Sequence, residues 1–148
     1  MKDFNLCIYE SMRSKDNKTV TLDDYVSMVK YGANQDAVIS ARAEKEKGNK
    51  ELYDKIKQNS KVVTPTGVFP SGLSKTRSNL TPNGLICIDI DSELTDAQIE
   101  DLYHDHYTYV IHRSFGGEGL CVFVRIDPKK IDDAYSAISK YYYDSYGV

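Results

Sequence analysis

The chain has 148 residues, of which 41% are hydrophobic and 28% charged, and its formal net charge at pH 7 is −3. This composition is typical of a soluble globular domain and excludes a wholesale basic nucleic-acid binder. No apolar run approaches the roughly 20 residues that a membrane-spanning helix needs, so we expect no membrane association. Three cysteines, Cys7, Cys87 and Cys121, have no metal-type spacing. With no signal peptide they predict reduced thiols and a cytoplasmic location.

The N-terminal part begins with a predicted strand and a predicted helix. Residues 4–9, with the sequence FNLCIY, favour a short strand. Residues 21–32 favour a helix that begins at Thr21 as N-cap, has Asp24 at its third position, and ends at a glycine. We therefore expect an N-terminal α/β extension before the clearer second half of the chain.

Residues 36–59 have strong helical propensity, with a weak point at Gly48. Residues 61–69 predict a strand and a turn. Residues 70–83 are rich in Ser, Thr, Pro, Gly and Asn and predict a flexible loop. This loop carries two positive charges that are candidate phosphate contacts: Lys75 and Arg77.

The second half predicts a compact core with the order strand, helix, strand, strand, helix. This βαββα order indicates an α+β (α/β) fold of the ferredoxin-like or RRM-like type, which normally has one more strand. We therefore expect one domain, 1–148, with an N-terminal α/β part (1–83) and a core (84–148). Either the N-terminal part donates a substitute for the missing strand, or the domain is truncated at its C-terminus. The predicted core elements are 85–91, 94–103, 107–114, 120–126 and 131–147.

Two aspartates stand near the end of the first core strand, GLICIDID. Alternation places Asp89 and Asp91 on one face of this strand, about 7 Å apart along it. Carboxylates this close repel unless a cation lies between them, and Mg²⁺ or Mn²⁺ is the usual partner. A strand that simply emerges into solvent explains the pattern equally well.

A glycine-rich loop follows between the two later core strands, in the sequence SFGGEG. Glycines permit positive φ and close approach of the backbone to a phosphate. Alone, the loop is more typical of a plain hairpin turn. Together with the Asp-x-Asp strand it predicts a nucleotide site, and the candidate nucleotide-binding residues of this loop are Ser114, Gly116, Gly117 and Gly119.

The segments GLICIDID and YTYVIHRSFGGEGLCVFVRID resemble the catalytic core of the archaeo-eukaryotic primase superfamily, the primase-polymerases. More narrowly, about residues 20–148 resemble the VirE N-terminal-type domain of mobile-element and phage replication proteins, often found ahead of a helicase-like domain. The resemblance implies that Asp89 and Asp91 are catalytic metal ligands. It also implies that the loop, with Cys121 at the phosphate-contacting position, binds nucleotide.

The chain departs from that family pattern at two points. Cys121 stands where primases carry a histidine that contacts phosphate, and a cysteine offers no fixed positive charge at pH 7. The third carboxylate of the superfamily is missing unless Asp127 replaces it. The expected function is therefore binding of nucleotide, single-stranded DNA and Mg²⁺ or Mn²⁺ in DNA replication, with template-dependent nucleotidyl transfer weak or lost.

Two other functions compete with this one. A module that binds nucleic acid or protein without catalysis fits the same departures. A relaxase-type nuclease would use the histidines of HDH, residues 104–106, with a nucleophile from YYY, residues 141–143, but Asp105 stands where relaxases need a hydrophobic residue. Arg113 and Arg125 either contact phosphates or pair with carboxylates on the sheet.

Overall fold

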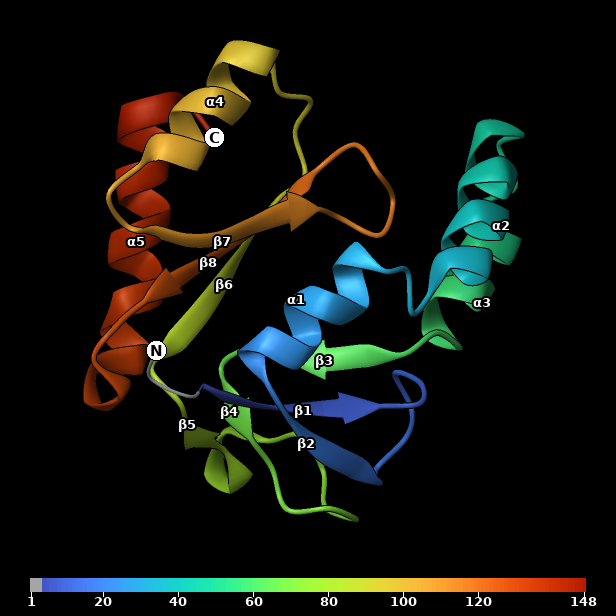
Figure 1. Cartoon of the computed structure of the whole chain (residues 1–148), viewed down its shortest axis with the longest axis horizontal. Helices are drawn as coiled ribbons and strands as arrows, with labels where there is room; N and C mark the ends of the chain where they lie inside the picture. Colours follow the sequence, from blue (N-terminus) through green and yellow to red (C-terminus); the bar gives the residue numbers. More distant parts are fainter. Residues whose placement is uncertain (1–3) are drawn as a thin grey trace. The chain divides into compact units, whose positions relative to one another are not determined.

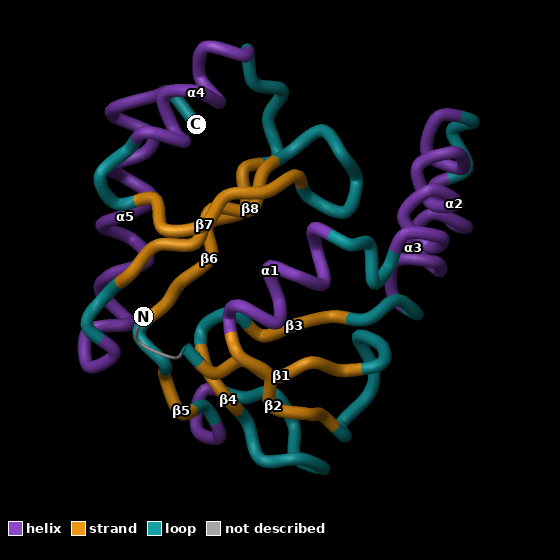
Figure 2. Tube along the Cα trace, viewed as in Figure 1, coloured by secondary structure: helices purple, strands orange, loops and turns teal. Residues whose placement is uncertain are grey.

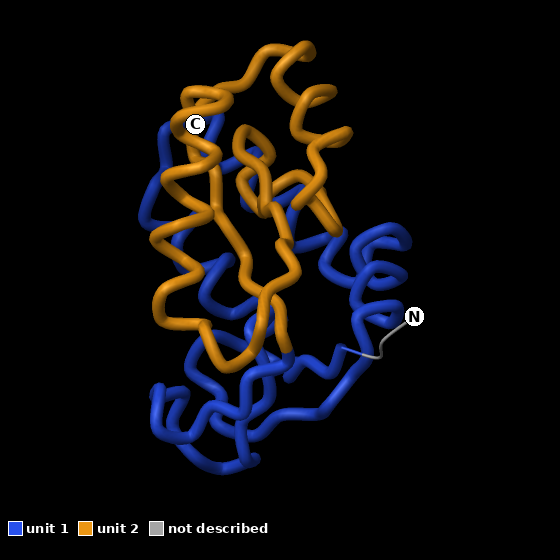
Figure 3. The backbone as a smooth tube through the Cα atoms, turned by 90° about the vertical axis from the view of Figure 1, so that its left-hand side faces the viewer, with its two compact units in different colours: residues 1–83 blue, residues 84–148 orange. Residues whose placement is uncertain are grey.

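The structure is a computed structural model that describes residues 4–148. It has mixed α and β architecture, as expected, with three small antiparallel sheets among the described residues (Figure 1). The chain forms two compact units, residues 1–83 and 84–148 (Figure 3). Each unit is described separately below.

The first unit is built on a three-stranded antiparallel sheet in the order β2-β1-β3. The central strand β1 (Asn5–Tyr9) matches the predicted first strand and buries the side chains of Leu6, Cys7 and Tyr9. The edge strands are β2 (Asn17–Thr21) and β3 (Val62–Thr64). The sequence did not predict β2, because this polar segment has no alternating apolar pattern and is defined by its pairing with β1.

Helix α1 (Leu22–Lys30) follows β2 and begins as the sequence predicted. The hydroxyl of Thr21 accepts from the backbone N–H of Asp24, and the carboxylate of Asp24 accepts from the backbone N–H of Thr21. The predicted helical stretch 36–59 is divided into α2 (Gln35–Glu46) and α3 (Lys50–Gln58), which lie side by side (Figure 2). The division falls at Gly48, whose φ of 74° is left-handed.

The segment 70–83, predicted as a flexible loop, contains a short 3₁₀ turn (Arg77–Asn79) and the strand β5 (Thr81–Pro82), which pairs with β4 (Gly67–Val68). Hydrogen bonds join its first part to the turn between β1 and β2. One runs from the backbone N–H of Gly72 to the carbonyl of Lys15 (3.1 Å). The segment is therefore anchored to the β1–β2 turn rather than free along its length.

The second unit has the predicted βαββα order. Its sheet contains β6 (Leu85–Ile90), β7 (Thr108–Arg113) and β8 (Leu120–Arg125), in the order β6-β8-β7, with both pairs antiparallel. Strand β8 thus lies between two strands that are joined by helix α4 (Asp96–His104), which is a split βαβ arrangement. A 3₁₀ turn (Pro128–Lys130) leads into α5 (Ile131–Tyr146).

Both helices of the second unit lie on the same side of this sheet (Figure 1). Alternate residues of the two strands β6 and β8 are buried and form its core: Ile86, Ile88, Ile90, Leu120, Val122 and Val124. The capping box predicted at the start of α4 is present, with Thr95 and Gln98 each accepting from the backbone N–H of the other. The specific core of a primase is not established by these features.

A buried carboxylate joins α5 to the turn between α4 and β7. Asp105 is only 9% exposed, and its Oδ2 accepts hydrogen bonds from the hydroxyls of Tyr141 and Tyr146, both at 2.6 Å. Its Oδ1 accepts from the backbone N–H groups of Tyr107 and Thr108. Although burial opposes ionisation, these hydrogen bonds outweigh it and lower the pKa of Asp105.

The residues around Asp105 give no support to the relaxase alternative. His104 is the last residue of α4, so the two histidines do not flank a residue of a strand. Hydrogen bonding to Asp105 raises the pKa of Tyr141, and burial raises the pKa of Tyr142 to about 12. A raised pKa makes a phenol harder to ionise and is the opposite of an activated nucleophile.

Candidate functional site

The pairing of β6 with β8 places Asp89 directly opposite Cys121, and the pairing of β8 with β7 places Cys121 opposite His112. Side chains that face each other across an antiparallel pair project from the same face of the sheet. The three residues therefore form one row across the sheet. Within this row the thiol of Cys121 donates to Oδ1 of Asp89, with 3.2 Å between sulfur and oxygen.

The environment of Cys121 keeps its thiol protonated. Its hydrogen bond with the Cys87 thiol, then burial, then the negative charge of Asp89 raise the pKa of Cys121 far above its usual value. Cys121 is thus a neutral hydrogen-bond donor to Asp89, and it supplies no positive charge for a phosphate. The sequence did not predict this donor role.

The glycine loop lies directly against the end of β6. A Cβ atom at Gly119 would collide with the carbonyl oxygen of Ile90 and come within 3.3 Å of the Cα of Asp91. The loop is closed by hydrogen bonds from the N–H of Ser114 to the carbonyl of Gly119 (2.9 Å) and from the N–H of Gly117 to the carbonyl of Ser114 (3.0 Å). The loop and the segment that carries Asp91 are therefore neighbours, although 22 residues separate Asp91 from Arg113 along the chain.

Gly117 and Gly119 are required by the backbone itself. Gly117 has a φ of 87°, and Gly119 allows the close approach to β6. Gly116 does not have a positive φ and is the loop glycine whose conformation suits other residues. A bulky side chain at Gly119 would therefore disturb the sheet as well as any ligand.

The two candidate arginines lie at opposite ends of the sheet, Arg113 as the last residue of β7 and Arg125 as the last residue of β8. Arg113 pairs with Leu120, the first residue of β8, and its guanidinium donates to the carbonyl of Glu118 in the glycine loop (3.4 Å). Arg125 is the last residue of β8 and faces Leu85. Arg125 is four positions along the strand from Cys121, which is about 13 Å. Arg113 therefore adjoins the loop and Arg125 does not.

Asp127 does not supply a third carboxylate to this site. It follows β8 at the end remote from the glycine loop, and its side chain accepts from the backbone N–H of Lys129 (3.0 Å). It therefore caps the 3₁₀ turn that precedes α5, which is the structural role favoured by the Asp-Pro sequence.

The remaining candidate cations, Lys75 and Arg77, belong to the first unit. The ammonium group of Lys75 donates to the carbonyls of Ser14 (2.7 Å) and Met12 (3.2 Å) and lies 4.1 Å from the ring centroid of Tyr9. Lys75 therefore holds two loops of the first unit together. Arg77 begins the 3₁₀ turn and is exposed.

The described residues offer no closed metal site around the two carboxylates. Asp89 and Asp91 are both exposed, and residues 4–148 contain no group of three His, Cys, Asp or Glu side chains that could hold a metal ion. Mg²⁺ commonly binds one or two carboxylates and fills its other positions with water and phosphate oxygens. Two carboxylates alone would therefore leave most positions of such a cation to water or to a ligand.

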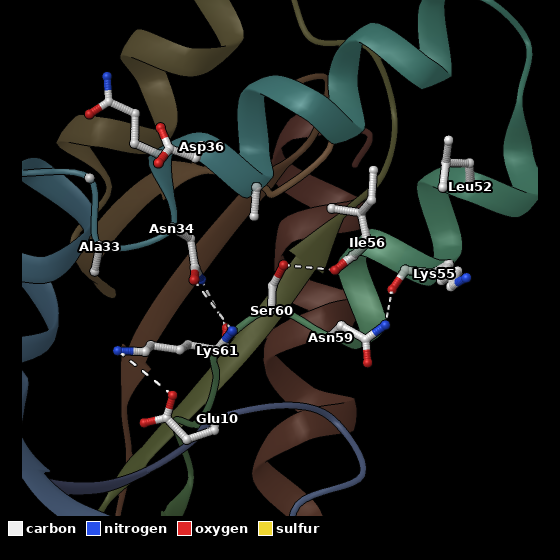
Figure 4. A pocket seen from close by; sticks show the side chains of 13 residues that line it. Glu10, Ala33, Asn34, Asp36, Leu52, Lys55, Ile56, Asn59, Ser60 and Lys61 are labelled. Carbon is white, nitrogen blue, oxygen red and sulfur yellow. Dashed lines mark hydrogen bonds and ion pairs between the residues drawn. The ribbon is translucent and has the colours of Figure 1, made fainter.

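Two hollows were not predicted from the sequence. One, of about 300 Å³, lies between α4 and β7 in the second unit and is lined by Ile99, Tyr103, Ile111 and Arg113 among others. The other, of about 640 Å³, lies in the first unit and contains none of the predicted site residues. In it the side chain of Asn34 bonds the backbone of Lys61, and Lys61 faces Glu10 at 3.8 Å (Figure 4).

A comparison with known families gives one match. The family described as BT4734-like, N-terminal domain, matches residues 55–146, which is more than half of the chain. The chain belongs to this family. The matched region begins within α3 and ends with α5, so it includes the Asp-x-Asp strand and the glycine loop of this BT4734-like domain. No curated protein and no solved structure matched the chain.

This match corrects the family assignment made from the sequence. The BT4734-like family differs from the VirE N-terminal-type primase-polymerase family, so the assignment to the latter was wrong. The residue patterns that suggested it are present, but an Asp-x-Asp strand and a glycine hairpin are short motifs. As for membranes, no helix among the described residues of this BT4734-like domain is long and apolar enough to cross one.

Proposed function

We propose that residues 84–148 bind a divalent cation, Mg²⁺ or Mn²⁺, together with the phosphates of a nucleotide. The observation that carries the proposal is the contact of Gly119 with the backbone of Ile90 and Asp91. This contact supports the proposal because the chain segment that carries Asp89 and Asp91 lies beside a loop whose backbone can approach an anion closely.

In this proposal Asp89 and Asp91 hold the cation, and the loop residues 114–119 lie against the phosphates. The cation neutralises phosphate charge when it is bound. Arg113 projects with Leu120 from the helix-covered face of the sheet, opposite to the face of Asp89, but its guanidinium reaches the carbonyl of Glu118 in the loop, and from there it adds a fixed positive charge. Because the second unit holds twelve acidic and five basic side chains, a net charge of −7, we expect phosphates to bind poorly until the cation has bound.

The proposal is limited to binding. Nucleotidyl transfer was expected from a family resemblance that the comparison corrects, and Cys121 is a neutral thiol at the position where that chemistry would need a cation. A role in the replication of a mobile element or phage, and a helicase-like partner, stay predictions. The matched family is named for an N-terminal domain, and we infer that this binding serves a longer protein.

The test is a Mn²⁺ titration followed by paramagnetic broadening of backbone amide signals in NMR spectra. We expect broadening centred on residues 89–91 and 114–119, and its loss in the double variant Asp89→Asn/Asp91→Asn. The matched control is Asp101→Asn, an exposed aspartate on α4. Calorimetry with ATP, with and without Mg²⁺, then measures nucleotide binding. Identical Mn²⁺ broadening in the wild type and the double variant would contradict the proposal.

A further inference from the structure

The two units of this chain carry opposite net charges. Residues 1–83 contain fourteen basic and ten acidic side chains, a net charge of +4, against −7 for residues 84–148. The overall charge of −3 is the sum of these two opposite values. In the absence of a bound cation, a polyanion is therefore repelled by the second unit on average and attracted by the first.

The net positive charge of the first unit is accounted for by two segments, because the basic and acidic side chains elsewhere in this unit are equal in number. We define the basic loop surface as residues 11–18, around the turn between β1 and β2, and residues 70–79, which follow β4. These segments contain five cationic side chains and one acidic side chain, that of Asp16. The five cationic residues are all exposed: Arg13, Lys15, Lys18, Lys75 and Arg77.

Specific hydrogen bonds hold the two loops together although more than 50 residues separate them. The backbone N–H of Asn17 donates to the hydroxyl of Ser71 (3.1 Å), in addition to the bond from Gly72 to Lys15. The ammonium group of Lys75 reaches across to two carbonyls of the β1–β2 turn, including that of Ser14 at 2.7 Å. The cations are therefore gathered by the fold, and not by adjacency in the sequence.

The polar composition of these loops also matches phosphate recognition. Residues 11–18 and 70–79 include six Ser or Thr side chains and two Asn side chains, which are common partners of phosphate oxygens beside Lys and Arg. They contain no aromatic residue, and the ring under Lys75, that of Tyr9, is only 1% exposed. Stacking on bases is therefore not offered by the described part of this surface.

We propose that the basic loop surface binds the phosphate backbone of a polynucleotide without reading its sequence. This surface is separate from the cation and nucleotide site proposed for the second unit. Lys75 is engaged in joining the loops, and Arg13 donates one hydrogen bond to Oε1 of Gln58 (3.2 Å). Lys15 and Lys18 therefore carry most of the contact, together with the remaining donors of Arg13 and with Arg77 beside them. With three or four such contacts, the slope of log K against log salt is roughly −2 to −4.

The test measures binding of the full chain to a fluorescently labelled single-stranded DNA of mixed sequence by anisotropy, in EDTA at low and at raised salt. EDTA leaves the Asp89–Asp91 site without a cation. A failure of the basic loop surface to bind DNA is therefore distinguishable from a failure of the second unit to bind nucleotide. We expect the triple variant Arg13→Glu/Lys15→Glu/Lys18→Glu to bind at least about tenfold more weakly, with a shallower salt slope.

The matched control is Lys50→Glu/Lys55→Glu/Lys57→Glu, which makes the same change of charge at exposed positions of α3. We expect the affinity of this control for the labelled DNA to fall by less than about threefold. Thermal melting must show that both variants are folded. Equal loss in the two triple variants would overturn the proposal, as would wild-type protein that binds heparin but not DNA. Duplex DNA and RNA of the same length, run in parallel, show which polynucleotide the surface prefers.

Discussion

The thiol of Cys121 donates a hydrogen bond to Oδ1 of Asp89 across the β6–β8 pair, with 3.2 Å between the two atoms. The bond satisfies one oxygen of a carboxylate that is otherwise exposed, and it uses a proton that the raised pKa of Cys121 retains at neutral pH. A cation that binds Asp89 must therefore compete with the thiol or use the other oxygen.

This competition predicts that removing the thiol strengthens cation binding. In Cys121→Ala the carboxylate of Asp89 loses its donor, and we expect Mn²⁺ to bind roughly fivefold more tightly, the equivalent of about 1 kcal/mol for one hydrogen bond. Cys121→Ser retains a donor and is the control, with little expected change. Weaker Mn²⁺ binding by Cys121→Ala than by Cys121→Ser, measured by NMR line broadening, would contradict the competition.

The contact between Gly119 and β6 predicts a large effect of a single methyl group. Gly119→Ala forces Cβ against the carbonyl of Ile90, so the two strands must separate locally, and we expect the free energy of unfolding to fall by about 1–3 kcal/mol. Gly116 lies in the same loop but does not have a positive φ, so Gly116→Ala should lower the free energy of unfolding much less. Urea unfolding of the three proteins measures both differences, and equal stabilities would show that β6 and the loop are not in close contact.

The buried carboxylate of Asp105 predicts a stability that depends on pH. Asp105→Asn removes the charge that accepts hydrogen bonds from Tyr141 and Tyr146, and we expect a loss of about 1–3 kcal/mol at pH 7. Because the pKa of Asp105 is lowered in the folded state, its contribution is present above the unfolded-state pKa and is lost as the pH falls through the folded-state value.

Urea unfolding of wild type and Asp105→Asn at a series of pH values checks this dependence. The difference in free energy of unfolding between the two proteins should be largest near neutral pH and should disappear at acid pH. Asp101→Asn, an exposed substitution on the preceding helix α4, controls for the loss of one negative charge. A difference in free energy of unfolding that stays constant across the pH series would mean that folding does not favour the ionised form of Asp105.

The features of this fold that depend on residues close together in the sequence were predicted. Features that depend on contacts between residues far apart in the sequence were not. The capping boxes at Thr21 and Thr95 depend on residues three positions apart, so the sequence contains the whole motif. The break at Gly48 is also local, since a left-handed φ ends a helix. Strand β2 was missed because its polar residues become a strand only through pairing with β1.

The same distinction applies to the candidate site. Alternation along the predicted strand 85–91 identified Asp89 and Asp91, although β6 ends one residue before Asp91, and glycine content identified the loop. Only the register of β6 with β8 brings Asp89 to Cys121. Asp105 was missed because its partners lie more than 35 residues later on α5. Lys75 was predicted as a phosphate contact, although its donors are directed to two carbonyls of a distant loop.

The positions of Arg113 and Arg125 provide the sharpest test of where phosphate binds. Arg113 adjoins the glycine loop, whereas Arg125 lies at the far end of β8, about 13 Å from the row that contains Cys121. We expect Arg113→Gln to weaken binding of Mg²⁺–ATP by about three- to tenfold, as for the loss of one charge-assisted hydrogen bond, and to leave Mn²⁺ binding alone unchanged. Arg125→Gln removes the same charge from the same sheet and should change neither. Calorimetry of the two variants decides the matter: an equal loss of ATP affinity would mean that net charge, and not the loop, attracts the nucleotide.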